Sequence, residues 1–321
     1  MKLSVLVNLY GNLPLAEALC KIKAQGAEAV EIAAGGYPGK AHCDPAALLN
    51  DAEALKNFKA AVDNSGLEIC AFAVHGNPVH PDKKLAAGYD GDFRAAVLLA
   101  EKLGVGTVIT FSGCPGDSPS AKYPNWVTCP WPDDFLAILE YQWNDVLIPY
   151  WKDAGAFAKA RNVKIALEMH PGFCVYNPAT LLRLREAAGC AVGANFDPSH
   201  LVWQGMDPVA AIRKLSGAIF HVHAKDTKVD KYNTAADGVL DTKHYGDELN
   251  RSWVFRSVGY GNDMTYWRDM ISNLRLVGYD KALSIEHEDS LMSIDEGLSK
   301  AAYFLKQAMI SDPKPTGMSW A

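Results

Sequence analysis

Short apolar runs alternate along the chain with longer segments in which apolar residues recur every three or four positions. Runs such as VGTVITF (105–111) and VKIALEM (163–169) are continuous, which is typical of strands in a parallel sheet covered on both faces. The longer segments have the spacing of amphipathic helices. The pattern predicts strands over residues 3–9, 28–34, 67–74, 105–112, 163–169, 192–197, 218–224 and 282–287.

Several predicted helices begin at a recognisable capping residue. Asp44, Asn177 and Asp207 each precede a proline. Their side-chain oxygens can accept a hydrogen bond from a free backbone amide of the first turn, and the proline has no amide that needs one. Gly104 and Gly278 stand near predicted helix ends, where a positive φ is often required. These signals predict helices over residues 14–25, 45–65, 90–103, 133–161, 178–188, 208–216, 263–277 and 293–310.

Strand and helix pairs repeated in this way predict an α/β fold, a (β/α)8 TIM barrel in which residues 1–321 form a single domain. A doubly wound sheet is the alternative. It normally carries a glycine-rich turn after its first strand, and VNLYGNLP (7–14) is not such a turn. The long connections 113–132 and 227–262 follow strands, so we expect both at the C-terminal face of the barrel, where active-site loops collect.

Composition and charge narrow the classes of function. The chain has 321 residues, of which 49% are hydrophobic, and a net charge of −6, which disfavours nucleic acid as a partner. Its seven cysteines include no C-x-x-C pair, which disfavours a disulfide framework or zinc knuckle and favours a cytoplasmic location. No apolar run approaches the ~18 residues of a membrane span. We therefore expect a small-molecule partner, with no nucleic acid and no membrane.

Four apolar runs end in acidic or basic residues at matching positions: IALEMHP (165–171), GANFDPSH (193–200), IFHVHAKD (219–226) and LSIEHED (283–289). Charged groups in buried strands need a partner. In a barrel these runs would direct Glu168, Asp197, His223 and Glu286 to one point near the C-terminal end. Three carboxylates and one imidazole suit one divalent metal ion, Mn²⁺ first, with Mg²⁺ or Co²⁺ as alternatives.

Other polar residues near these strand ends are candidates for contact with a substrate, although an ordinary structural role stays open for each of them. His170 shares the inward side of its strand with Glu168 and is a candidate proton carrier. Glu31 is a further acid in a predicted strand, and we expect it to support the site rather than to act in catalysis. The candidate substrate-binding residues are His75, His200, Lys225 and Arg256.

The ordered strings around Glu168, D-P-S-H (197–200), H-x-K-D (223–226) and I-E-H (285–287) resemble the sugar-phosphate isomerase/epimerase family of xylose isomerase-like TIM barrels. This family includes ketose 3-epimerases and inosose dehydratases. The resemblance covers nearly the whole chain and is strongest from 163 to 310. It implies that Glu168, Asp197, His223 and Glu286 hold the metal, that both glutamates also move protons, and that His200 contacts the substrate. Arg256 is the nearest match to a substrate-binding arginine after the seventh strand.

Metal chemistry and resemblance together lead to one reaction class. We expect a sugar epimerase or isomerase that removes a proton next to a carbonyl through a metal-stabilised enediolate, with Glu168, Glu286 and His170 as catalytic residues. If a β-substituent leaves instead, the enzyme is a lyase or dehydratase acting on a keto-inositol or 3-keto-glycoside. Remote alternatives are a phosphodiesterase resembling AP endonucleases, using Asp241 and His244, and a non-catalytic sugar-binding barrel. Related barrels are often dimers or tetramers, so a homo-oligomer is a further expectation.

Overall fold

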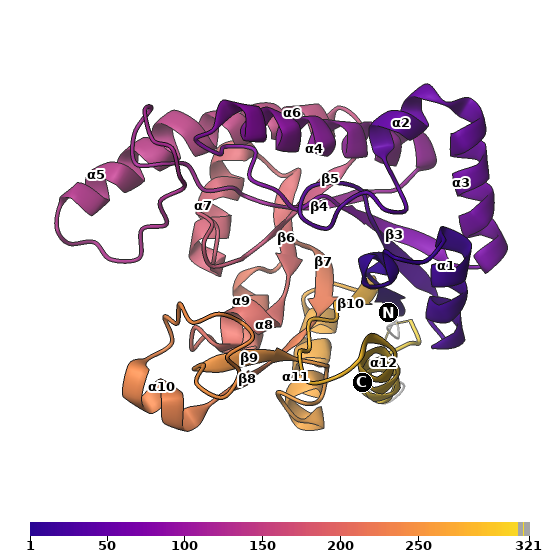
Figure 1. Cartoon of the computed structure of the whole chain (residues 1–321). Helices are drawn as coiled ribbons and strands as arrows, with labels where there is room; N and C mark the ends of the chain where they lie inside the picture. Colours follow the sequence, from indigo (N-terminus) through magenta and orange to yellow (C-terminus); the bar gives the residue numbers. More distant parts are fainter. Residues whose placement is uncertain (314–316, 318–321) are drawn as a thin grey trace.

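Eight parallel strands run through the centre of the computed structural model, which describes residues 1–313 and 317 (Figure 1). They form one sheet in the order β1-β10-β7-β6-β5-β4-β3-β2. A bridge between Leu6 and Glu31 joins the two edge strands, so the sheet is a nearly closed barrel. This confirms the predicted fold and excludes the doubly wound sheet. The strands are β1 (Lys2–Val5), β2 (Ala29–Ala33), β3 (Glu68–Ala73), β4 (Thr107–Phe111), β5 (Lys164–Glu168), β6 (Val192–Phe196), β7 (Ile219–Ala224) and β10 (Ala282–Ile285).

Helices connect the strands, and the predicted caps are present. Asp44 accepts a hydrogen bond from the Ala46 amide, Asn177 from the Thr180 amide and Asp207 from the Ala210 amide. Within residues 1–313, no helix combines the length and the apolar character that crossing a membrane requires. The helices are α1 (Leu15–Ala24), α2 (Pro45–Asn50), α3 (Ala52–Ser65), α4 (Lys83–Leu103), α5 (Asp134–Glu140), α6 (Ile148–Lys159), α7 (Pro178–Ala188), α8 (Pro198–Val202), α9 (Pro208–Lys214), α10 (Lys231–Asp237), α11 (Met264–Leu276) and α12 (Ile294–Ala308).

Several predicted elements have different bounds in the structure. The helix predicted over 45–65 is broken at Asp51, which is extended and caps α3 by accepting from the Glu53 and Ala54 amides. The helix predicted over 133–161 contains a π-helical segment, η2 (Tyr141–Leu147), just before Pro149, which has no amide to donate one turn back. The first strand stops at Val5, and a 3-10 turn, η1 (Val7–Tyr10), replaces the rest.

The segment 227–262 is more ordered than the loop that the sequence predicts. It contains most of an antiparallel hairpin, β8 (Asp226–Val229) with β9 (Trp253–Arg256), and all of α10. The hairpin is held by its own small apolar cluster, in which Trp253 stacks on Trp203 with ring centroids 4.5 Å apart. The connection after β7 is therefore an ordered substructure that lies beside the C-terminal ends of the barrel strands.

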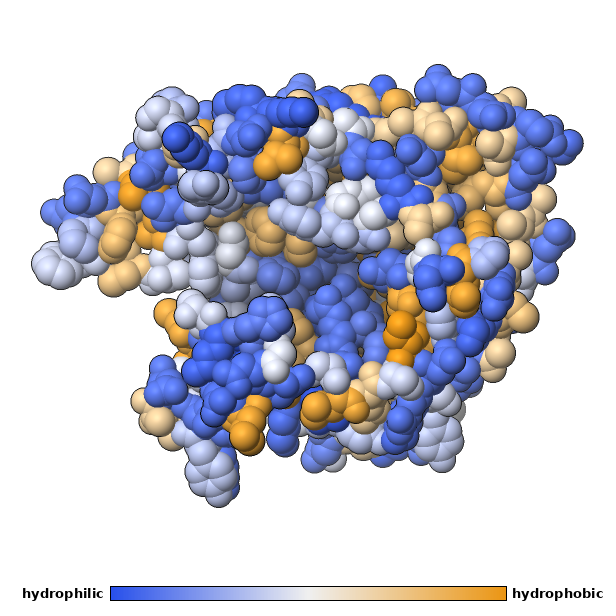
Figure 2. All heavy atoms as spheres, in the orientation of Figure 1, coloured by the Kyte–Doolittle hydropathy of each residue, from blue (hydrophilic) through white to orange (hydrophobic). Residues whose placement is uncertain are grey.

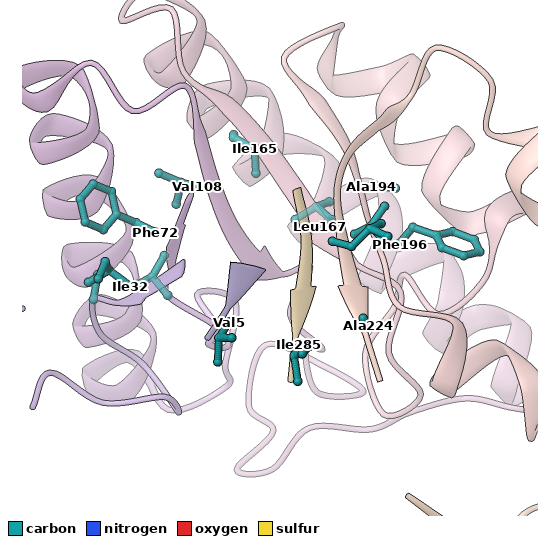
Figure 3. Packing of buried hydrophobic residues seen from close by; sticks show 14 of the residues in the cluster. Val5, Ile32, Phe72, Val108, Ile165, Leu167, Ala194, Phe196, Ala224 and Ile285 are labelled. Atoms are coloured by element: carbon teal, nitrogen blue, oxygen red, sulfur yellow. The ribbon is translucent and has the colours of Figure 1, made fainter. Parts of the chain in front are cut away.

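Residues alternate in direction along the barrel strands. One set, including Val108, Ile165, Leu167 and Phe196, packs against the surrounding helices in the main apolar cluster (Figure 3). The other set faces the barrel interior. Near the N-terminal ends of the strands, these interior residues form a separate apolar cluster. Near the C-terminal ends the interior residues are polar, and they form the candidate site. The interior cluster consists of Ala71, Ile109, Ala166 and Phe220.

Candidate metal centre and active site

Four side chains with metal-binding groups meet where β5, β6, β7 and β10 end. Glu168 is the last residue of β5, Asp197 follows β6 and caps α8, His223 lies near the end of β7, and Glu286 follows β10. One potential ligand atom from each side chain lies within 4.8 Å of those of the other three. The structure thus brings together the four residues that the sequence predicts as ligands.

Two atoms of this cluster are buried beside charged groups but without a hydrogen bond. Lys225 Nζ lies 3.4 Å from Asp197 Oδ2, and Glu168 Oε2 and Glu286 Oε2 each lie 3.1 Å from His223 Nδ1. Asp197 Oδ2 and His223 Nδ1 make no hydrogen bond within the part of the chain that the structure describes. Burial, helped by the charges of Glu168 and Glu286 and opposed by Lys225, raises the pKa of Asp197 to about 7. Buried polar atoms without partners are costly. A divalent cation would satisfy both atoms and offset the carboxylate charges, so this donor set fits such an ion.

Glu168 is held by three donors. His75 Nε2 and Asn195 Nδ2 donate to its Oε2 at 3.0 and 2.9 Å, and His200 Nε2 donates to its Oε1 at 3.1 Å. Burial alone would raise the pKa of Glu168, but the charge of His75, the hydrogen bond with His200 and the close approach of His223 hold it well below the usual range. The carboxylate is therefore ionised, and both its oxygens are engaged.

Lys225 places a buried ammonium group beside the other acids. Its Nζ lies 3.0 Å from Glu286 Oε2, 2.9 Å from Glu288 Oε2 and 3.4 Å from Asp197 Oδ2. Burial lowers the pKa of Lys225, but these carboxylates raise it well above its ordinary value, so the lysine is charged. For the acid Glu286 burial acts in the opposite direction and raises the pKa, but the charges of Lys225 and His223 together bring it down to about 2.

Neutral rings form one side of the site. The rings of His170 and His200 lie 4.0 Å apart, and burial lowers the pKa of both histidines. The ring nitrogen Nδ1 of His170 is 2.5 Å from the Pro171 carbonyl oxygen, which directs Nε2 away from the backbone. Phe111 packs edge-on against His170 and stacks on Phe173, at 4.9 and 4.3 Å between centroids. His170 is thus a neutral, oriented imidazole next to the Glu168 group.

Arg256 and Asp226 have local partners. Arg256 donates through Nε to both oxygens of Asp289 at 3.1 Å and lies over the ring of Tyr260. Among described residues it makes no ion pair or hydrogen bond with the four-residue cluster. Asp226 accepts from the amides of Gly259, Gly261 and Asn262 and from Trp267 Nε1. It therefore anchors the connection after β9 and does not pair with Lys225.

Glu31, expected as a supporting acid, lies inside the barrel and contacts two histidines of β7. Its carboxylate is 2.9 Å from His221 Nε2 and 3.1 Å from His223 Nε2. Asn195 and Glu288 also contact the site, and neither was predicted to do so. Asn195 lies on β6 two residues before Asp197, and Glu288 lies two residues after Glu286, just beyond β10, so the period of two was the signal that pointed to them.

The strand ends open into a hollow on this face of the molecule. Figure 2 shows it between the part that contains α4 and α6 and the part that contains α10, β8 and β9, with a largely hydrophilic floor. Aromatic rings border the site. Phe111 and Phe173 stack on each other beside His170. Phe255 and Tyr245, with centroids 5.9 Å apart, lie where Phe255 contacts Lys225. Such rings suit the apolar faces of a polyol.

A family model described as "Xylose isomerase-like TIM barrel" matches residues 19–308. The chain belongs to this family. It is 40% identical over 312 residues, 96% of the chain and 99% of the relative, to "Uncharacterized protein YfiH" of Bacillus subtilis (strain 168). A shorter match, 34% identical over 92 residues, covers 28% of the chain and 30% of an inosose dehydratase from Clostridium tetani (strain Massachusetts / E88).

Solved structures agree with the fold of this family. The crystal structure of a D-tagatose 3-epimerase-like protein superposes with a TM-score of 0.65 at 20% identity, covering 96% of this chain and 97% of that one. At this identity the likeness concerns the fold alone. The proteins similar to this chain in fold or in sequence thus include an epimerase-like protein and an inosose dehydratase, in agreement with the resemblance predicted from the sequence.

Proposed function

We propose that this protein is a divalent-metal-dependent enzyme that removes a proton from a carbon next to the carbonyl group of a small sugar or polyol. The observation that carries this proposal is the convergence of Glu168, Asp197, His223 and Glu286, with two of their ligand atoms buried and without a hydrogen bond among the described residues. The ion, when bound, supplies Lewis-acid polarisation of the substrate carbonyl. Mn²⁺ is our first expectation because the ligands are mainly carboxylate oxygens, with Mg²⁺ and Co²⁺ as alternatives.

Glu286 is the better placed of the two glutamates to take the proton. Its pKa of about 2 keeps it ionised at neutral pH, and its side chain is 15% exposed, whereas that of Glu168 is 2% exposed. Glu168 already accepts from three donors, which use three of the roughly four acceptor sites of a carboxylate and lower its basicity. In epimerisation Glu286 acts on one face of the carbon and Glu168 on the other, while isomerisation returns the proton to the neighbouring carbon.

The difference in hydrogen bonding between the two glutamates also favours a second reaction, an elimination. If only Glu286 exchanges protons freely, another group near the site must supply the proton that the leaving group needs. His170, a neutral imidazole oriented by the Pro171 carbonyl, can give a proton to a departing β-substituent. The result is a lyase or dehydratase acting on a keto-inositol or 3-keto-glycoside, and the similarity to an inosose dehydratase supports this alternative.

Substrate contacts follow from the groups around the cluster. His200 and His75 hold Glu168 and face the same space, and the Lys225 ammonium can donate to a substrate hydroxyl or carbonyl oxygen. Arg256 contributes only if its pairing with Asp289 leaves its outer nitrogens free for the substrate. Asp241 and His244 bind backbone amides of their own segment, which gives no support to a phosphodiesterase.

We also propose a cytoplasmic location and a homo-oligomeric assembly. All seven cysteines are free, as expected for a reducing cytoplasm. A homo-oligomer, dimer or tetramer, is retained from the family resemblance.

Solvent deuterium exchange tests the proposed function. Protein loaded with Mn²⁺ and given a panel of ketoses, keto-inositols and 3-keto-glycosides in deuterated water should introduce deuterium at the α carbon of the true substrate. Loss of water or of an aglycone identifies the lyase, and a new stereoisomer identifies the epimerase. Glu286→Gln, which removes the proposed base, should abolish exchange, and Glu53→Gln, on the exposed surface of α3, is the matched control. Unchanged exchange in Glu286→Gln contradicts the role assigned to this residue.

A further inference from the structure

Glu31 occupies an unusual position inside the barrel. It lies on β2, whereas the histidines that it contacts lie on β7, and these two strands are not neighbours in the sheet. The carboxylate therefore crosses the barrel interior, and it is completely buried together with both imidazoles. A buried acid that reaches across a barrel to two histidines needs a reason, because burying three titratable groups is costly.

Hydrogen-bonding roles in this group are determined by the acid. Both Nε2 atoms lie within hydrogen-bond distance of the Glu31 oxygens, at 2.9–3.1 Å. A carboxylate accepts hydrogen bonds, so each imidazole presents an Nε2–H group to it. For His223 this leaves Nδ1 on the opposite edge of the ring, 3.1 Å from both Glu168 Oε2 and Glu286 Oε2.

We propose that Glu31 is a positioning residue for the metal: it holds His223 in the orientation and tautomer that direct the Nδ1 lone pair to the ion. Among the described residues, Glu31 alone forms hydrogen bonds with Nε2 of His223. Histidine ligands of metals commonly donate their second ring nitrogen to a carboxylate in this way. The inference rests on the proposed function, since it concerns the ion of the same site.

His221 shares the acceptor. Its Nε2 lies 2.9 Å from Glu31 Oε2, the oxygen that His223 Nε2 also approaches at 3.1 Å. The carboxylate has two oxygens and can serve both rings. A glutamine at this position would offer one acceptor oxygen and one donating amide, so one of the rings would have to turn or change its tautomer. If that ring is His223, Nδ1 carries a proton and cannot bind a metal.

Glu31→Gln is the first test, because it keeps the size of the side chain and removes the second acceptor. We expect Mn²⁺ to bind about 10- to 100-fold more weakly by isothermal titration calorimetry, as is usual when a carboxylate behind a metal-binding histidine is changed. The visible absorption of bound Co²⁺ should also change, since it reports on the ligand geometry. Glu53→Gln is the surface control and should leave both measurements unchanged.

A second variant separates positioning from a simple structural role. His221→Phe removes the competing donor and keeps a ring in the same place. In Glu31→Gln/His221→Phe the single amide oxygen is free to serve His223, so we expect Mn²⁺ to bind more tightly than in Glu31→Gln alone. If Glu31 and His221 only stabilised the barrel, the double variant would bind Mn²⁺ more weakly than Glu31→Gln alone. If Glu31→Gln does not fold, the double variant is compared with His221→Phe, and equal affinity is expected.

The outcomes distinguish this inference from the proposed function. If wild-type protein binds no divalent ion and catalyses no exchange, the proposed function is wrong. If the wild type binds Mn²⁺ and Glu31→Gln binds it within about twofold, with an unchanged Co²⁺ spectrum, Glu31 does not position the ligand. A double variant that binds more weakly than Glu31→Gln overturns the competition between the two histidines.

Discussion

Replacing Lys225 by methionine tests how the buried charges of the site are balanced. The substitution keeps an unbranched side chain of similar length and removes an ammonium group that lies 2.9–3.4 Å from three carboxylates. Removing one partner of a buried ion pair typically costs about 3–5 kcal/mol. We take the lower end, about 3 kcal/mol, because the side chain of Glu288 is 48% exposed and water can solvate it.

The loss should appear mainly in metal-free protein. A loss of about 3 kcal/mol lowers the Tm of a domain of this size by about 4–5 °C. In the presence of Mn²⁺ the ion takes over the neutralisation of Asp197 and Glu286, so most of the lost stability should return. Because the variant lacks a cation that repels the ion, we also expect its Mn²⁺ affinity to rise by about tenfold, or about 1.4 kcal/mol.

Two measurements check this reasoning. Thermal unfolding in chelator and in excess Mn²⁺ gives the difference in stability between the two states, and isothermal titration calorimetry gives the affinity. Lys228→Met, an exposed lysine in the following strand β8, is the matched control and should change neither. Weaker Mn²⁺ binding by Lys225→Met, or a metal-free Tm within about 1 °C of wild type, would refute the charge balance described here.

Two further predictions concern pH and packing. His223, whose pKa the nearby carboxylates raise despite burial, and Asp197, whose pKa is about 7, must release protons when an ion binds, so Mn²⁺ affinity should increase with pH, by about tenfold per unit above pH 7. Calorimetry in buffers of different ionisation enthalpy counts these protons, and a pH-independent affinity would contradict the assignment. Gly193→Ala should destabilise the barrel by about 1–3 kcal/mol in urea, because its Cβ would lie 2.4 Å from the Ala218 carbonyl oxygen. Gly91→Ala, in open space on α4, should instead stabilise by about 0.5–1 kcal/mol, and equal effects would disprove the packing argument.

The secondary structure was largely predictable from the sequence, and each error in the prediction has a physical cause. The eight strands were recognisable because buried parallel strands are continuous apolar runs. Helix α4 begins at Lys83 rather than near residue 90, because Asp82 caps it there, and the glycines at 88 and 91 weakened the helical signal. The hairpin β8–β9 escaped prediction, since its Trp253 and Phe255 are buried by packing on residues distant in sequence, Trp203 among them. Its stability comes from a contact distant in sequence.

The residues around the metal centre were predictable only in part. Inward-facing positions follow from the period of two along each strand, so the four candidate ligands could be named together. Their partners could not, because each contact joins different strands. The His75–Glu168 contact spans 93 positions and the Glu31–His223 contact spans 192. Arg256, chosen for its place after the seventh strand, pairs with Asp289, which no sequence signal indicated.

The sequence by itself determined the order of strands and helices, and with it the face of the barrel on which the acidic and basic residues gather. Local backbone preferences and hydrophobic period are properties of neighbouring residues, so they can be seen in the chain alone. Only the tertiary structure decided which oxygen each histidine binds, that Glu168 accepts from three donors while Glu286 pairs with Lys225, and that Glu31 reaches across the barrel. Those facts depend on how a closed sheet places distant strands around one axis, and the resulting distances of about 3 Å decide the chemistry.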